Sequence, residues 1–229
     1  FCYLDFSTDP SALQCYAQDL IDSGGELPRS KNLGRVVIEL DQAAWAPRLC
    51  ENFRSLCTGE RGIGVGGNRM HYKDCKLTHI LPRFCVQVSI PNEYSCWGRY
   101  LEDEKLFISG VKFDRPGLVA ISNHGPNTNT CSFMITLNEA EHLDGHNQII
   151  GRVVRGIEVL RAIELFPTDR SEVSYIERNV KSWRGGKPLV DVVVEDSGEL
   201  PEGRLDMSVP ADGDDLPENP LDFSCTKDP

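Results

Sequence analysis

Hydrophobic residues alternate with polar or small residues in several short segments of the chain. Residues 1–7 (FCYLDFS) and 34–40 (GRVVIEL) alternate in this way, which predicts two strands. Further apolar runs predict six more strands, at residues 77–81, 84–90, 117–122, 132–137, 148–154 and 189–195. Because these strands do not alternate regularly with helices, they favour a mainly β fold with a closed antiparallel barrel over a doubly wound parallel sheet.

Other segments have the periodicity of helices. Residues 47–57 begin with Pro47, which suits a first helical turn, and Gly59 lies just beyond their end. The apolar positions of this segment fall on one face: Leu49, Cys50, Phe53, Leu56 and Cys57. A second helix is predicted over 157–165 (IEVLRAIEL), and a shorter one over 11–21 (SALQCYAQDLI), between the first two strands.

The composition is typical of a folded globular protein and disfavours some classes of partner. Of the 229 residues, 40% are hydrophobic and 26% are charged. The net charge of −11 argues against a nucleic-acid-binding protein, which needs a positive face, and disfavours docking on anionic membranes. The sequence shows neither an apolar run of membrane-spanning length nor a signal peptide, and because it starts with Phe1 we expect a native N-terminus upstream. We therefore expect a cytoplasmic protein without nucleic-acid or membrane partners.

The composition changes near residue 200. Residues 201–229 hold five of the 14 prolines and eight acids but only two bases. Such a segment cannot bury enough apolar surface to fold alone. We therefore expect one domain over residues 1–200, with insertions at about 8–33 and 167–188, and an extended acidic tail over 201–229.

The nine cysteines form neither a C-x-x-C pair nor a regular framework. Several fall on apolar positions of the predicted helix at 47–57, so we expect buried, reduced thiols. Histidines and cysteines do not pair at the spacing of metal ligands, so no metal site is expected. The glycine-rich run at 59–68 (GERGIGVGGN) follows a helix and does not open one, which argues against a dinucleotide-binding turn. We expect no cofactor.

One stretch carries a specific resemblance. Residues 123–129 read NHGPNTN, followed by Phe133-Met134-Ile135 and by HLDG at 142–145. This order resembles the cyclophilin family, and further similar segments lie at 47–59, 82–87, 151–163 and 191–200. The loop after the first long helix is similar to that of the larger, divergent-loop cyclophilins. The resemblance spans residues 1–200 and implies an eight-stranded antiparallel barrel capped by two α-helices.

The resemblance also implies a groove that grips a proline ring and isomerises the peptide bond before it. Amide resonance opposes that rotation by ~18–20 kcal/mol, and twisting the bond localises a lone pair on the prolyl nitrogen. In cyclophilins an arginine donates to this nitrogen and stabilises only the twisted state. His79 stands at the position of that arginine in this chain.

The other groove positions implied by the resemblance include kept and changed residue types. Four keep the family's residue: Phe84, Gln87, Asn123 and Leu143. Six differ from the family's residue type: Cys85 replaces a methionine, Ser122 an alanine, Ser132 a glutamine, Met134 a phenylalanine, His142 a tryptophan and Asn147 a histidine. Phe84 and Met134 would be apolar core residues in any fold, and active large cyclophilins share the change at His142.

The substitution at His79 predicts weak catalysis or none. Histidine is mostly neutral at pH 7, and its ring is shorter than an arginine side chain with its fixed fork of donors. Arg83 lies four residues further on, replaces a glycine of the family, and would have to reach back over the pocket to substitute. The segment 88–100, in place of the family's glycine-rich saddle beside the catalytic strand, is also shorter.

Three functions fit these observations. We favour a structural or interaction module in a larger protein assembly, because the barrel carries additions at 8–33, 167–188 and 201–229 that hold Trp183 and Phe223. The alternatives are a weak or specialised peptidyl-prolyl isomerase that assists protein folding, and a protein that binds proline-containing peptides without turnover. Divergent cyclophilin-like proteins with eroded sites are similar to this one. Because some of them are components of ciliary radial spokes, we expect an axonemal assembly as the context.

Overall fold

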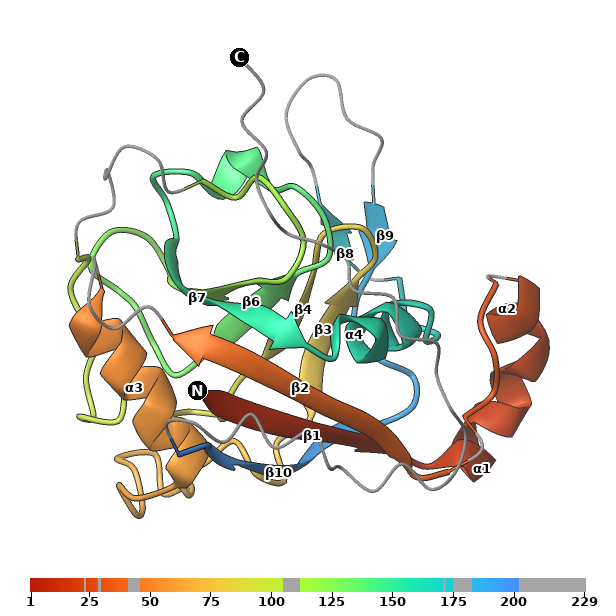
Figure 1. Ribbon diagram of the computed structural model, residues 1–229, viewed down its shortest axis with the longest axis horizontal. Coiled ribbons are helices and arrows are strands. Elements are labelled where there is room, and N and C mark those ends of the chain that lie inside the picture. Colours follow the sequence, from red (N-terminus) through yellow and green to blue (C-terminus); the bar gives the residue numbers. More distant parts are fainter. Residues whose placement is uncertain are drawn as a thin grey trace.

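Eight antiparallel strands form one sheet whose two edges meet, so that the sheet closes into a barrel (Figure 1). The strands follow the order β10-β1-β2-β7-β5-β6-β4-β3. A bridge between Lys76 and Val193 joins the two edges, where Val194 donates its N–H to the carbonyl of Cys75 at 2.8 Å. The expected eight-stranded antiparallel barrel is confirmed.

The strands are short, as the hydrophobic pattern predicts. The computed structural model describes residues 1–22, 24–28, 30–40, 46–104, 112–170, 172–174 and 183–201, with the backbone alone at 172–174 and 183–184. The barrel strands are β1 (Cys2–Thr8), β2 (Asn32–Leu40), β3 (Leu77–Leu81), β4 (Cys85–Val88), β5 (Leu118–Ile121), β6 (Phe133–Thr136), β7 (Gln148–Arg155) and β10 (Val192–Glu199). The last strand begins later than the predicted residue 189, because Leu189 donates its N–H to the carbonyl of Pro167 at the base of an insertion.

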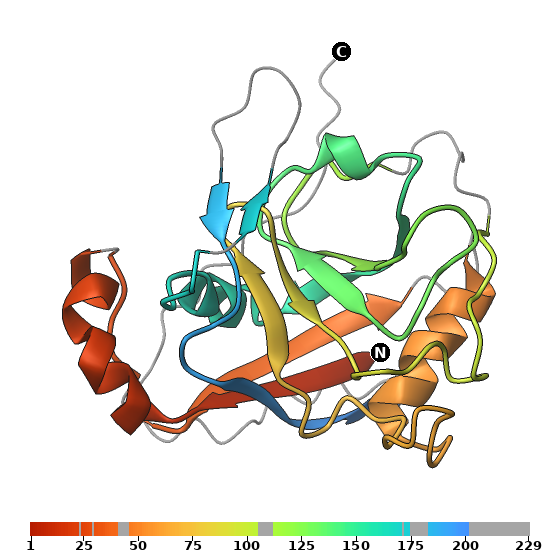
Figure 2. The same cartoon turned by 180° about the vertical axis from the view of Figure 1, so that it is seen from behind.

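Two helices lie on opposite sides of the barrel, α3 (Pro47–Thr58) and α4 (Ile157–Glu164), as Figures 1 and 2 show. Helix α3 starts at Pro47 and ends where Gly59 adopts a left-handed φ of 70°. Its Phe53 ring enters the core and lies 5.4 Å from the ring centroid of Tyr72 and 5.0 Å from that of Phe133. These aromatic contacts fix α3 against the barrel strands.

Alternation along the strands divides the apolar side chains between two clusters. Val86 pairs with Ile135 in the β4–β6 register, and both belong to the main core inside the barrel. Gln87 pairs with Met134, and Met134 belongs to a smaller apolar cluster. Because successive side chains in a strand point to opposite faces, this smaller cluster lies on the outer face of the barrel wall.

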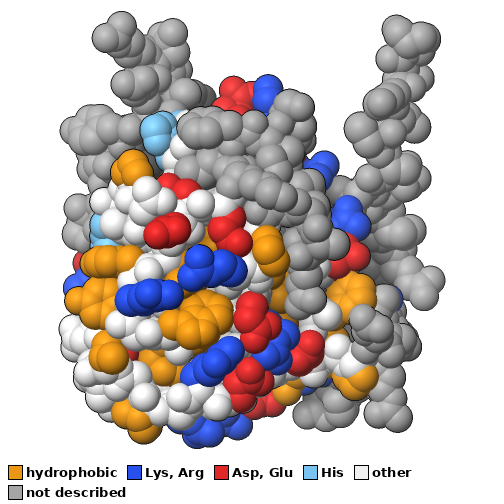
Figure 3. Space-filling view, turned by 90° about the vertical axis from the view of Figure 1, so that its left-hand side faces the viewer, with side chains coloured by type: hydrophobic (Ala, Val, Ile, Leu, Met, Phe, Trp, Pro, Cys, Tyr) orange, Lys and Arg blue, Asp and Glu red, His pale blue; other side chains and the backbone are white. Residues whose placement is uncertain are grey.

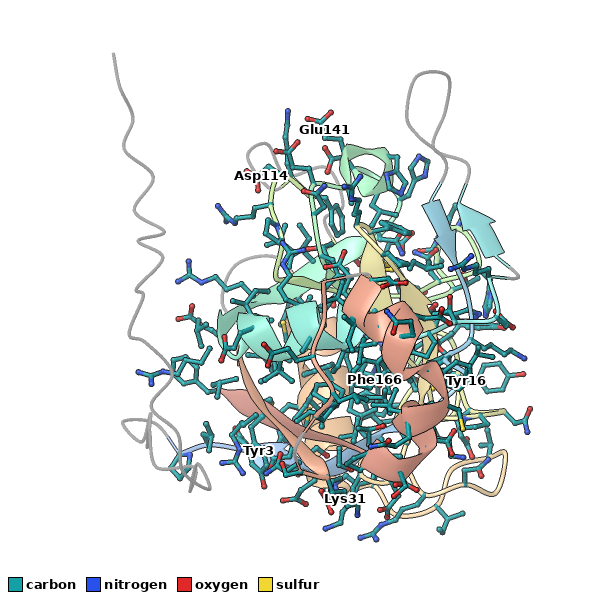
Figure 4. The ribbon with its side chains drawn as sticks, turned by 90° about the vertical axis from the view of Figure 1, so that its right-hand side faces the viewer. Tyr3, Tyr16, Lys31, Asp114, Glu141 and Phe166 are labelled. Carbon is teal, nitrogen blue, oxygen red and sulfur yellow. The ribbon has the colours of Figure 1, made fainter. Side chains whose placement is uncertain are left out.

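The first insertion is helical. It holds α1 (Pro10–Leu13), a single 3₁₀ turn and α2 (Ala17–Asp22), so the helix expected over 11–21 is present as consecutive short turns. The buried side chains of Leu13 and Leu20 join the main core, to which Tyr16 and Phe166 also belong (Figure 4). The insertion therefore packs onto the side of the barrel.

The second insertion is a hairpin fixed to the edge of β3. Strands β8 (Glu172–Ser174) and β9 (Trp183–Gly185) pair with each other. Gly186 and Ile80 then exchange two backbone hydrogen bonds, at 2.9 and 3.1 Å. The side chain of Trp183 and the predicted tail beyond Pro201, with Leu221 and Phe223, lie outside the described residues. No helix in the described segments is long and apolar enough to cross a membrane.

The expected burial of the cysteines holds for most of those that the structure describes. The structure describes eight cysteines; five are buried, Cys75 and Cys96 are half-buried, and Cys15 is exposed. Burial raises the pKa of Cys85 to about 12 and that of Cys96 to about 11. Protonated, buried thiols are poor nucleophiles.

Alkylation should separate these thiols. We expect iodoacetamide at pH 8 to modify Cys15 at least about tenfold faster than Cys85, because the thiolate is the nucleophile and Cys85 is both protonated and shielded. Peptide mass mapping of the native chain over time measures both rates. Equal rates in the native chain would contradict the burial of Cys85.

Candidate peptide-binding groove

Four neighbouring strands place a row of side chains on the outer face of the barrel. His79 of β3 pairs with Gln87 of β4, Gln87 with Met134 of β6, and Met134 with Ala120 of β5. Residues paired across antiparallel strands point to the same face and have Cβ atoms about 5 Å apart. His79, Gln87 and Met134 are therefore side by side, although they lie far apart in the sequence.

An apolar cluster adjoins this row. Its buried residues are Leu81, Cys85, Phe113, Leu118, Ala120, Met134, Ala140, Leu143 and Ile149, with Phe84 packed against them. The 3₁₀ turn η2 (Glu141–Leu143) contributes two side chains. Leu143 is buried in the cluster, and the His142 ring lies 4.8 Å from that of Phe84. The structure thus brings the predicted Phe84, Cys85, Met134, His142 and Leu143 together.

Polar side chains line the other side of the row. Gln87 donates from Nε2 to Ser122 Oγ at 3.1 Å, and the hydroxyl groups of Ser89 and Ser132 share a hydrogen bond of 2.6 Å. Asn123 Nδ2 donates to the backbone carbonyl of His146 at 2.7 Å. These bonds tie β4 to the segment that follows β5, the segment that follows β4 to the one that precedes β6, and the segment that follows β5 to the one that precedes β7.

Asn147, like Asn123, bonds to the backbone. It is half-buried and donates from Nδ2 to the carbonyl of Ile121 at 3.0 Å, where β5 ends. This bond holds the segment after η2 against the strand. The structure gives Asn147 a structural contact at the edge of the groove.

The fold and the groove can be compared with a known family. A family model described as cyclophilin type peptidyl-prolyl cis-trans isomerase/CLD matches residues 28–184, which is more than half of the chain. This chain belongs to the cyclophilin family. The matched range contains all of the predicted groove residues, from His79 to Asn147, and membership in this family implies binding of proline-containing peptides.

His79, at the position that the resemblance assigns to the cyclophilin arginine, lies in the middle of β3. It is half-buried, and its Nδ1 atom is buried. The imidazole ring begins one carbon from the backbone, whereas a guanidinium is carried at the end of a three-carbon chain. His79 therefore keeps its ring close to the barrel wall, between Gln87 and the hairpin bonded to Ile80.

Arg83 lies in the turn that joins β3 to β4, outside the row of His79. Phe84 donates its N–H to the carbonyl of Leu81 at 3.0 Å, with Pro82 and Arg83 at the two central positions. Arg83 has a φ of 61°, which is the left-handed region where glycine is favoured in such turns. Its N–H donates to Glu164 at the end of α4 at 2.6 Å, so the turn is fixed to that helix.

His142 gives this groove a pH-dependent stability. Burial lowers its pKa, while the charge of Asp144 raises it and that of His146 lowers it, with a net shift downward. The unfolded chain therefore binds a proton more readily as the pH falls below about 6.5, and the native state loses stability toward pH 5. We expect the melting temperature to fall less between pH 7 and pH 5 in His142→Trp than in the wild type. The effect is small because His142 is largely exposed, and equal losses in both chains would contradict it.

Sequence reasoning missed three exposed aromatic residues at the rim. Tyr94, Trp97 and Tyr100 lie in the segment that replaces the cyclophilin saddle, and 39%, 40% and 43% of their surfaces are exposed. The segment is fixed to α3 through a bond from Cys96 N–H to Asn52 Oδ1 at 2.8 Å. The spacing Y-x-x-W-x-x-Y was visible in the sequence but has no periodicity that distinguishes exposed from buried aromatics. Among the described residues no cluster of three His, Cys, Asp or Glu side chains could hold a metal ion.

Proposed function

We propose that this cyclophilin binds proline-containing segments of other proteins in its groove, isomerises them weakly or not at all, and serves as an interaction module in a larger assembly. The observation that carries the proposal is the residue at the centre of the row. His79 takes the place from which a guanidinium would reach the prolyl nitrogen, beside Gln87 and Met134.

Binding and catalysis make different demands on this site. Binding needs an apolar pocket for the proline ring, and Phe84, Met134 and Leu143 supply apolar walls for it. Catalysis needs a donor that is stronger in the twisted state than in the planar one, because uniform binding leaves the barrier unchanged. The imidazole of His79 leaves these apolar walls in place but does not supply the donor that catalysis needs.

A fully active isomerase is the second candidate. Gln87 in the row and Asn123 keep the family's residue types, and the apolar cluster with Leu143 adjoins them. The backbone of Arg83 is fixed in the turn by the bond from its N–H to Glu164, one turn away from the row that His79 starts, so its guanidinium would have to reach back toward Gln87. These facts favour retained binding more strongly than retained turnover.

The insertions support the assembly role. The helical insertion adds α1 and α2 to the side of the barrel, and the hairpin is bonded to β3 at Ile80, the residue after His79. Both additions enlarge the surface that is available to a partner, and binding residues are frequent in such connecting segments. The resemblance to cyclophilin-like proteins of radial spokes makes an axonemal assembly the context that we propose, with the acidic residues 201–229 as a contact segment.

An NMR titration tests the binding part of the proposal. We expect the peptide Ala-Ala-Pro-Phe to shift the backbone amide signals of β4 and β6, and Phe84→Ala to weaken the binding by about tenfold, since truncation of a central aromatic contact typically costs 1–3 kcal/mol or more. Ile21→Ala on α2 is the matched control, because Ile21 is 55% exposed and far from the groove strands in sequence and sheet order. Shifts confined to other strands would contradict the groove assignment.

A further inference from the structure

A second surface stands apart from the pocket. Five of the eight large hydrophobic side chains that are exposed in the described residues lie in two loops: Ile63 (69%), Val65 (67%), Tyr94 (39%), Trp97 (40%) and Tyr100 (43%). We call these five residues the aromatic surface. Single exposed hydrophobic residues are ordinary, but a cluster of this kind marks an interaction site.

The two loops form one continuous surface. The Tyr94 and Tyr100 rings meet edge to face at 4.9 Å, and the Arg61 guanidinium lies 5.3 Å from the Trp97 ring centroid. The two loops approach each other closely at Gly98, where an added Cβ would lie only 2.8 Å from Val65 Cγ1. Figure 3 shows hydrophobic side chains gathered between Lys and Arg side chains on the face of the molecule where α3 lies.

Both loops are held in place, so the apolar side chains are exposed by a fixed backbone. The carboxylate of Glu93 accepts the N–H groups of Gly66 at 3.1 Å and Asn68 at 2.9 Å, and Glu93 is only 8% exposed. The second loop is fixed to α3 by Asn52. A surface that is ordered before binding loses little conformational entropy when a partner docks.

We propose that the aromatic surface docks a proline-rich, acidic segment of a partner protein in an extended conformation. Exposed Trp and Tyr rings are the surfaces on which polyproline II segments pack, since such segments are already extended and lose little entropy on binding. The Arg61 guanidinium lies over the Trp97 ring, and Arg99, two residues after Trp97 in the same loop, is exposed. These two cations favour acidic residues between the prolines of the ligand. Because Arg61 already pairs with Glu51 at 3.4 Å, Arg99 is the principal charge contact for the ligand.

This docking surface borders the groove but does not include its pocket. The Tyr100 ring lies 6.3 Å from that of His124, the neighbour of Asn123. Trp97 and Val65, in contrast, belong to the loops beside α3. A proline-rich ligand has two places to bind on this chain, and the test must distinguish them.

Fluorescence anisotropy with a labelled peptide of four Pro-Pro-Glu repeats tests the proposal on the full chain. We expect Trp97→Ala to weaken binding by about tenfold or more, as for a central aromatic contact. Arg99→Glu should weaken it as well, and the loss should shrink as salt is raised. Ile21→Ala, a matched exposed residue, should leave binding within about twofold, and the groove variant Phe84→Ala should weaken it less than Trp97→Ala does.

Several outcomes would overturn the proposal. Loss of binding in Phe84→Ala but not in Trp97→Ala would assign the peptide to the groove, and equal binding of Pro-Pro-Lys repeats would remove the role of Arg99. No binding by the wild-type chain at millimolar peptide would end the proposal. Retention of the chain by phosphatidylserine vesicles, or self-association that Trp97→Ala abolishes, would assign the surface to a membrane or a second copy. If Trp97→Ala fails to fold, Arg99→Glu and Trp97→Phe carry the test, with binding lost in the first and kept in the second.

Discussion

Replacing His79 by arginine is expected to raise the rate of prolyl isomerisation by about 10²–10³-fold over the wild-type chain. The variant restores a donor at the centre of the row formed with Gln87 and Met134. A guanidinium there donates to the prolyl nitrogen only in the twisted state, in which the lone pair is localised on that nitrogen. The bond therefore stabilises the transition state more than the ground state, and the barrier falls. Exchange NMR on Ala-Ala-Pro-Phe measures the rate without a coupling protease.

Two controls isolate the charge from the change in shape. His79→Gln is longer than histidine but carries no charge, and we expect it to stay at the wild-type rate. Arg83→Gln in the wild-type background should also change nothing, since Arg83 lies in the turn fixed to Glu164. A His79→Arg variant that binds the peptide without gaining turnover would contradict the view that a missing donor is the main defect.

A cyclosporin-type cyclic peptide is expected to bind the wild-type chain weakly and the double variant Met134→Phe/His142→Trp at least about tenfold more tightly. Such ligands fill the same groove in cyclophilins, and each large aromatic contact at a binding hot spot is worth about 1–3 kcal/mol. Met134 is a buried wall of the pocket, and the His142 ring lies 4.8 Å from that of Phe84, so both substitutions act on the pocket itself.

Isothermal titration calorimetry measures both affinities. The control is the double variant Ile21→Phe/Leu189→Trp, which introduces the same two aromatic residues at positions outside the groove. Both of these positions are exposed. Nanomolar binding by the wild-type chain would contradict the account, because it would mean that Met134 and His142 replace the family's aromatics without loss.

The fold followed from the sequence because the strands obey simple periodicity. Residues 77–81 became β3 with the predicted bounds, and the helix predicted at 47–57 became α3. Pro47 and Gly59 mark its ends through backbone geometry that few other residues adopt. The hairpin at 167–188 could not be predicted, because its attachment to Ile80 depends on backbone bonds between segments that are distant in the sequence.

The candidate groove residues came from a motif, whereas the exposed aromatic residues beside them did not. The resemblance named His79, Gln87 and Met134, and the register of β3, β4 and β6 brings them into one row. No motif described Trp97, whose exposure depends on how its loop is fixed to α3. Exposure of an apolar side chain is set by tertiary contacts, so a hydrophobic pattern alone predicts it poorly.

The steady-state rate of the wild-type chain tests the central claim most directly. With Ala-Ala-Pro-Phe as substrate and an ordinary single-domain cyclophilin measured beside it, we predict that kcat/KM of this chain is lower by about 10²–10³-fold, the usual effect of losing one preorganised donor. The same peptide should still shift the backbone amide signals of β4 and β6, so that the low rate is accompanied by binding in the groove. A kcat/KM within about tenfold of the ordinary cyclophilin would contradict the claim, and would mean that His79 or Arg83 supplies the donor in the working enzyme.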